Sequence, residues 1–97
     1  MSYDMGIADK NFNYTYNVAG MWYASEPELG IRTIYGLSGE QARPVLCKMR
    51  EYMEDHWQEM LDMEPSNGWG SAIGALTFLS ELIIACVEHP NDFWQGD

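Results

Sequence analysis

A long amphipathic segment in the middle of the chain constrains the fold most strongly. Apolar side chains recur along it every three or four residues, at Ala42, Leu46, Met49, Met53, Trp57 and Met60. Acidic side chains occupy the opposite side, at Glu51, Glu54, Asp55, Glu59 and Asp62. This period predicts a helix from Val45 to residue 62 or 63 that lays one face on a core.

The ends of this helix carry local signals. Ser38 and Gln41 have the spacing of a capping box, in which each side chain bonds the other residue's backbone. Pro44 lies in the second turn, where a proline is expected to kink the helix or make it restart. Pro65 ends the segment, and the turn dipeptide Asn67-Gly68 follows it.

A second and more apolar helix is predicted from Ser71 to about His89. Ser71 is the expected N-cap, and Pro90 stops the helix. Its main apolar stripe consists of Ala72, Leu76, Leu79, Ile83 and Val87. Because only a short loop separates the two helices, they are expected to pack antiparallel.

Residues 11–18 have a different period. Phe12, Tyr14, Tyr16 and Val18 alternate with polar residues, which predicts a strand with one face on the core. A single strand is not stable alone, so it needs a partner. Residues 31–35 are the candidate, although residues 28–36 fit a strand and a short helix equally well.

These elements predict an α-dominated α+β fold, with an N-terminal strand or hairpin packed on an antiparallel two-helix pair. The chain of 97 residues suits a single small acidic domain, 1–97, with loosely ordered ends at 1–10 and 91–97. The polar start lacks a basic leader region, and the apolar run 72–87 is too short to span a bilayer. A cytoplasmic protein is therefore expected.

Charge is distributed unevenly along the chain. Fifteen acidic residues oppose five basic ones, which gives a net charge of −10. Every Lys and Arg lies before residue 51, whereas ten acids lie in residues 51–97. A field of one sign repels nucleic acid and anionic membranes and attracts basic surfaces. We therefore expect a basic partner protein and no direct contact with nucleic acid or membrane. In a narrower form of this prediction, the partner is itself a nucleic-acid-binding protein.

The acidic side of the central helix is the predicted contact with that partner. Carboxylates four residues apart are about 6 Å apart along a helix, and one DNA strand carries a phosphate about every 3.4 Å. A row of carboxylates can therefore imitate phosphates. Like-charged pairs such as Glu51 and Asp55 destabilise a helix, and only Lys48 offsets them. The competing interpretation is a solvated helix face. The predicted contact residues are Glu51, Glu54, Asp55, Glu59 and Asp62.

The sequence contains no pattern typical of an enzyme, cofactor or metal site. Cys86 and His89 are three residues apart, as are His56 and Glu59, but neither pair belongs to a four-ligand zinc pattern. We therefore expect no catalytic residues, no cofactor and no metal. Cys47 and Cys86 are both expected to be buried free thiols.

Three short motifs resemble a known group of proteins: residues 13–18 (NYTYNV), 36–39 (GLSG) and 67–70 (NGWG), the last followed by an apolar helix. The chain resembles short, uncharacterised proteins of bacteriophages and some actinobacteria over residues 11–90. That resemblance implies no catalytic residues. It implies a setting in which small acidic proteins block host defences or host enzymes, some of them by imitating DNA.

Two alternatives remain open. The first is a small-ligand module that uses the aromatic, Asn-rich strand and the loop at 67–70. Core packing explains the same aromatic residues, with Trp69 closing the end of the core. The second is a phage structural or assembly protein that pairs through an exposed strand edge. The ligand pocket would be lined by Tyr14, Tyr16, Asn17, Asn67 and Trp69.

Overall fold

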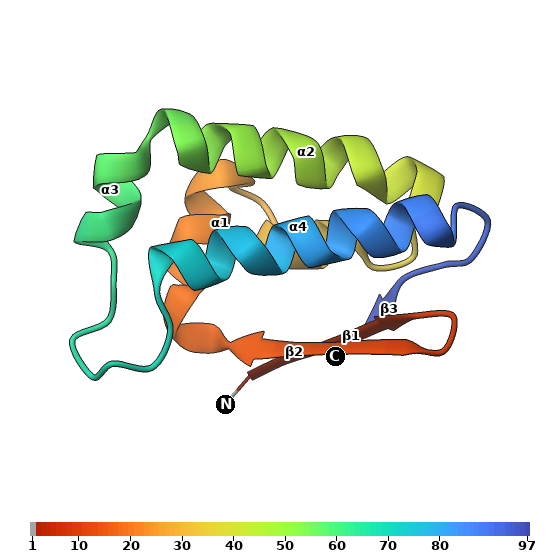
Figure 1. Cartoon of the computed structure of the whole chain (residues 1–97), viewed down its shortest axis with the longest axis horizontal. Helices are drawn as coiled ribbons and strands as arrows, with labels where there is room; N and C mark the ends of the chain where they lie inside the picture. Colours follow the sequence, from red (N-terminus) through yellow and green to blue (C-terminus); the bar gives the residue numbers. More distant parts are fainter. Residues whose placement is uncertain (1) are drawn as a thin grey trace.

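The computed structural model describes residues 2–97 and has an α+β architecture in which helices dominate (Figure 1). One layer is an antiparallel sheet of strand order β2-β1-β3, and α2 and α4 run antiparallel over it. The predicted fold class and the antiparallel helix pair are confirmed. The strands are β1 (Ser2–Ile7), β2 (Lys10–Thr15) and β3 (Gln95–Gly96). The α-helices are α1 (Ala19–Ser25), α2 (Gly39–Asp55), α3 (Trp57–Asp62) and α4 (Ala72–Glu88), and the 3₁₀ helices are η1 (Tyr16–Val18) and η2 (Gly30–Ile34).

The core lies between one face of the sheet and the helices. β1 contributes alternate side chains, Tyr3, Met5 and Ile7, each at most 4% exposed. The facing side chains of β2 pack on α4, where Tyr14 stacks on Phe78 with ring centroids 5.6 Å apart. The other face of β2 is polar and exposed. The period of two in the sequence therefore marks one buried sheet face, as expected.

The N-terminal end is more ordered than expected. Ser2–Ile7 is the central strand and pairs along its full length with β2, from Ser2↔Thr15 to Ile7↔Lys10. The expectation of a loose end is therefore wrong for residues 2–10, while residue 1 lies outside the described residues. Asp4 and Gly6 favour strands poorly, so the local signal for β1 was weak.

The strand predicted at 11–18 is shorter than expected, and its predicted partner is a helix. β2 ends at Thr15, whose side-chain oxygen accepts a hydrogen bond from the Asn17 amide and starts η1. Residues 30–34 form η2, so the strand alternative for this segment is wrong. The partner strand of β2 is instead β1, which a two-residue turn joins to it.

The C-terminal end is also ordered, which corrects the expectation for residues 91–97. Trp94 is fully buried, and its backbone exchanges hydrogen bonds with the segment before α2: its amide donates to the Leu37 carbonyl and its carbonyl accepts from Gly36, both at 2.9 Å. β3 then pairs with β1. Burial of the large indole outweighs the chain entropy that frees most termini.

The helix signals are largely confirmed. Ser38 and Gln41 form the predicted capping box, and Ser71 caps α4 by accepting from the Gly74 amide at 2.9 Å. α2 continues through Pro44 without restarting. On α4, however, Val87 is 59% exposed, because the buried face is centred elsewhere. That face consists of Ala72, Ala75, Phe78, Leu79, Leu82, Ala85 and Cys86.

The turn between β1 and β2 contains a strained residue. Ala8 has φ of 54°, in the left-handed region that disfavours residues with a Cβ. We expect Ala8→Gly to raise the free energy of unfolding by about 1 kcal/mol, because glycine adopts this conformation without steric cost. Urea denaturation measures the change. The matched control is Ala19→Gly, at φ of −54°, where the same change should be destabilising. A loss of stability in Ala8→Gly would contradict the strain.

Candidate acidic interface

The predicted contact residues gather on the solvent side of α2 and α3, and we call them the acidic face. All five side chains are exposed, whereas Met49, Met53 and Met60 on the other side are buried. The amphipathic period therefore placed these carboxylates on the surface correctly. The acidic face consists of Glu51, Glu54, Asp55, Glu59 and Asp62.

Few cations or donors neutralise the acidic face. Arg50 Nε lies 3.2 Å from Glu54 Oε1, one turn apart on α2, and Gln58 donates to Asp62 Oδ1 at 3.1 Å. Arg50 therefore offsets part of the charge, whereas Lys48, the expected cation, forms no ion pair in the described part of the chain. Within residues 2–97, Glu51, Asp55 and Glu59 form no ion pair. Most of this negative charge faces solvent.

The acidic face bends at His56, which the sequence did not predict. α2 ends at Asp55, and His56 has φ of −118° and ψ of 36°, outside helical geometry. The His56 ring stacks on Tyr52 with centroids 3.9 Å apart, and its Nδ1 donates to the Tyr52 carbonyl at 2.9 Å. These contacts hold the bend, and α3 turns away from α2 (Figure 1). A single helix through residue 62 is therefore wrong, and the straight acidic row ends at Asp55.

The residues of the predicted ligand pocket are distributed over separate contacts. Tyr14 packs against both Trp22 and Phe78, and its hydroxyl oxygen accepts from the Ser71 amide at 3.2 Å. Tyr16 instead packs edge-on against Tyr3, with ring centroids 4.4 Å apart. The structure thus places the two tyrosines in different contacts.

The loop residues of that predicted pocket contact one another and Asn17. Trp69 is 71% exposed, so it does not close the end of the core. The Asn67 side chain accepts from the Trp69 amide at 2.9 Å in a local turn, and Asn17 donates to the Trp69 carbonyl at 3.3 Å. These contacts shape the loop. Tyr14 lines a hollow beside α4, which the other four side chains of the predicted pocket do not line.

Arg32 lies at the centre of a cluster of aromatic and charged side chains that the sequence did not reveal. The Arg32 guanidinium lies over the rings of Tyr3 and Tyr16, 4.8 and 5.3 Å from their centroids. It donates to the Tyr16 hydroxyl at 2.7 Å and lies 3.9 Å from Asp97 Oδ1. This arginine is therefore engaged in holding the C-terminal strand and does not offset the acidic face.

The phenols around this cluster are harder to ionise than ordinary tyrosines. Burial, followed by the negative charge of Asp97, raises the pKa of Tyr35 to about 12. Burial also raises the pKa of Tyr3. Both groups stay neutral at physiological pH, and the Tyr35 hydroxyl donates to Asp97 Oδ1 at 3.3 Å.

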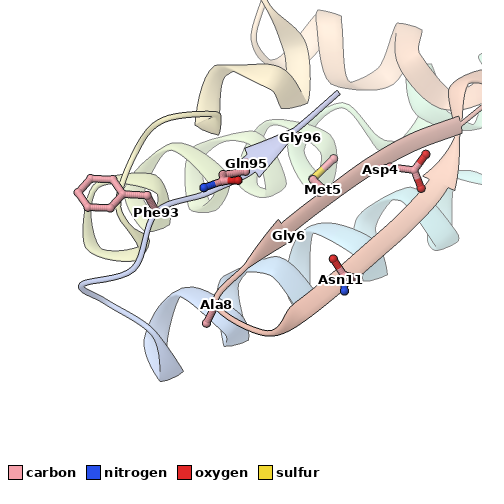
Figure 2. A pocket seen from close by; sticks show the side chains of 8 residues that line it. All are labelled: Asp4, Met5, Gly6, Ala8, Asn11, Phe93, Gln95 and Gly96. Atoms are coloured by element: carbon pink, nitrogen blue, oxygen red, sulfur yellow. The ribbon is translucent and has the colours of Figure 1, made fainter.

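The open face of the sheet carries a shallow hollow of about 410 Å³ (Figure 2). Asp4 and Asn11 from the hairpin lie on one side of it, and Phe93 and Gln95 on the other (Figure 2). The Asp4 carboxylate already accepts from the Asn13 side chain at 2.6 Å. The arrangement offers a polar surface.

The two cysteines lie in different environments, one buried and one exposed. Cys86 is buried, which raises the pKa of its thiol, and its sulfur accepts from Trp94 Nε1 at 3.3 Å. Cys47 is exposed, so the expectation that both thiols are buried is wrong for this one. Within residues 2–97, no group of three or more His, Cys, Asp or Glu side chains is placed to hold a metal ion.

Comparisons of the chain with protein-family models, with curated proteins and with solved structures gave no match. The resemblance to small bacteriophage and actinobacterial proteins therefore stays a prediction. Across the described residues, each helix is too short or too polar to cross a bilayer.

Proposed function

We propose that this chain is a non-enzymatic binding protein that docks its acidic face on a basic surface of a partner protein. The observation that carries the proposal is the exposure of five carboxylates on α2 and α3 beside a single paired cation, Arg50. Such a surface attracts a basic partner over a distance of about one Debye length, roughly 8–10 Å in physiological salt. In the bacteriophage setting that the resemblance implies, the partner is a basic host protein in the cytoplasm.

Helix stability does not account for Glu51 and Asp55. By contrast, Glu54 pairs with Arg50, and Glu59 lies in the first turn of α3, where an acid is favourable. Glu54 and Asp55 lie in the last turn of α2, which contains no basic residue, and this is the negative end of the helix dipole. An acid at that end costs about 0.3–1 kcal/mol. Glu51 and Asp55 also repel each other one turn apart. Selection for stability does not explain carboxylates that lower helix stability, so their positions support a role in binding.

The bend at His56 supports the general form of the proposal over the narrower one. Imitation of a straight phosphate row needs evenly spaced carboxylates, and only Glu51, Glu54 and Asp55 lie on the straight part of the face. We therefore favour electrostatic docking on a basic protein surface. Nucleic-acid mimicry is its narrower form, in which the captured partner also binds DNA and releases it on binding this protein.

The test neutralises the acidic face with Glu51→Gln, Asp55→Asn, Glu59→Gln and Asp62→Asn in one variant. Immobilised protein is incubated with bacterial lysate at low and at high salt, and captured proteins are identified and then purified for affinity measurements. We expect the variant to bind a captured basic partner at least about fourfold more weakly, since each of the four lost ion pairs contributes about 0.2–1 kcal/mol. High salt should weaken the native protein's binding similarly.

A matched variant separates the acidic face from net charge. Asp9→Asn, Glu26→Gln, Glu28→Gln and Glu40→Gln remove the same number of charges from the net −10 but lie outside the face. This control should retain most of the binding. Equal binding by both variants and the native protein would refute the proposal and leave the face as a solvated surface.

A further inference from the structure

A groove runs between the edge strand β2 and the helix α4. It consists of two adjoining hollows of about 300 and 190 Å³ that share Glu81 as a lining residue. Tyr14 and Phe78 line the first hollow, and Phe12 and Ile84 line the second. We call this feature the β2–α4 groove. Because β2 is an edge strand, the direction of its backbone amides and carbonyls decides whether a segment in the groove can pair with it.

The turn fixes which β2 backbone groups point into the groove. A two-residue turn joins the paired residues Ile7 and Lys10, and the pair that closes such a turn is hydrogen-bonded. Bonded pairs then alternate along the hairpin, so Asn11 and Asn13 direct their amides and carbonyls away from β1. The Asp4 carbonyl, opposite Asn13, accepts from the Asp97 amide of the C-terminal segment at 3.1 Å, as this pattern requires.

The free edge therefore offers a ladder for another strand. In the order β2-β1-β3, no strand among residues 2–97 occupies the outer side of β2. An edge strand with free amides and carbonyls is a template for strand addition. β2 carries neither a proline nor a bulge over its six residues, so the template is unprotected.

The α4 wall of the groove carries apolar and acidic side chains. Ile73 and Ile84 are 60% and 58% exposed, which is unusual for isoleucine, and Glu81 lies between them with Glu88 beyond. Successive positions Ile73, Thr77 and Glu81 are about 6 Å apart along the helix. Alternate side chains of a strand are about 6.8 Å apart, so each can meet one position of this wall.

We propose that the β2–α4 groove binds an extended segment of a partner protein as a fourth strand beside β2, with apolar and basic side chains directed at α4. Glu81 and Glu88 outnumber Lys10 along the groove, which selects a basic segment. A second copy of the chain fits worse, since pairing would bring together two molecules of charge −10. This site involves other elements than the acidic face and does not depend on it.

The probe is a synthetic peptide, acetyl-Thr-Val-Thr-Ala-Thr-Lys-Thr-Val-Thr-amide. When the peptide lies antiparallel to β2, its Val, Ala, Lys and Val side chains meet α4 in the order Ile73, Thr77, Glu81 and Ile84. The backbone amides of its Thr residues then face β2. We expect the peptide to slow hydrogen exchange at the Asn11 and Asn13 amides, measured by NMR. N-methylation of the two Thr amides that flank Ala should abolish binding, whereas N-methylation of the Ala and Lys amides, which face solvent, should preserve it.

A charge exchange tests the α4 wall. Glu81 is exposed, so Glu81→Lys leaves the core intact. This variant should bind the Lys peptide about fivefold more weakly than the native protein does. It should regain that affinity for a peptide in which Glu replaces Lys. Glu51→Gln, on the acidic face, should change nothing. The proposal is overturned if Asn11 and Asn13 exchange is unaffected, if both N-methylated peptides bind alike, or if these amides are protected in a dimer of the free protein.

Discussion

Trp94→Ala should lower the free energy of unfolding by about 3–5 kcal/mol, the usual cost of deleting a fully buried large aromatic side chain. The indole is 0% exposed, lies 5.8 Å from the Phe12 ring and donates to the Cys86 sulfur at 3.3 Å. It connects the C-terminal segment to both β2 and α4. Its loss leaves a cavity and also frees β3 from β1.

The loss is large for a domain of this size. Total stability is about 0.05–0.15 kcal/mol per residue, so Trp94→Ala removes at least about a fifth of the margin. Urea denaturation followed by circular dichroism measures the change. The matched control is Trp69→Ala: that indole is 71% exposed, and its removal should shift stability by less than about 0.5 kcal/mol. Comparable losses in the two variants would show that Trp94 does not anchor the C-terminal segment.

Gly39→Ala is expected to destabilise the protein by about 1–3 kcal/mol, although alanine favours helices more than glycine does. Gly39 is the first residue of α2 and packs against the C-terminal end of α4. A Cβ there would collide with the His89 carbonyl oxygen and lie 2.9 Å from that of Cys86. Both obstacles are backbone atoms, which cannot rotate away as a side chain can.

The close approach also serves the hydrogen bonds that join these elements. The Gly39 amide donates to the Asp92 carbonyl at 2.9 Å, and the Glu40 amide donates to the Pro90 carbonyl at 3.0 Å. Displacement by a methyl group would lengthen both bonds. The control is Gly20→Ala in α1, where the nearest atom to a new Cβ, Met63 Sδ, lies at an ordinary 3.8 Å. That variant should gain about 0.5–1 kcal/mol, measured as before. A gain in Gly39→Ala as well would contradict the close packing.

The candidate acidic face could be predicted from the sequence only in part. The exposure of Glu51, Asp55 and Glu59 follows from helical period, which is a local property of residues a few positions apart. The bend at His56 was not predictable, because it depends on how the Tyr52 and His56 rings stack and on a ring-to-carbonyl hydrogen bond. The cluster around Arg32 was not predictable either, because its partners come from both ends of the chain.

The sequence by itself determined the features that local rules govern: the Ser38–Gln41 cap, the Ser71 cap and the apolar side of α2. It predicted α4 as a helix, but the buried face of α4 is centred elsewhere than expected. The period of two predicted β2, but tertiary structure alone decided which strands pair with which. β1 and β3 pair Met5 with Gly96, from opposite ends of the chain, and that pairing is fixed by the burial of Trp94 and by backbone hydrogen bonds that almost any residue type can make. The β2–α4 groove has the same origin, since its two walls meet only when the hairpin packs beneath α4. Local periodicity records which side of an element is apolar, whereas the identity of its neighbour emerges only from folding.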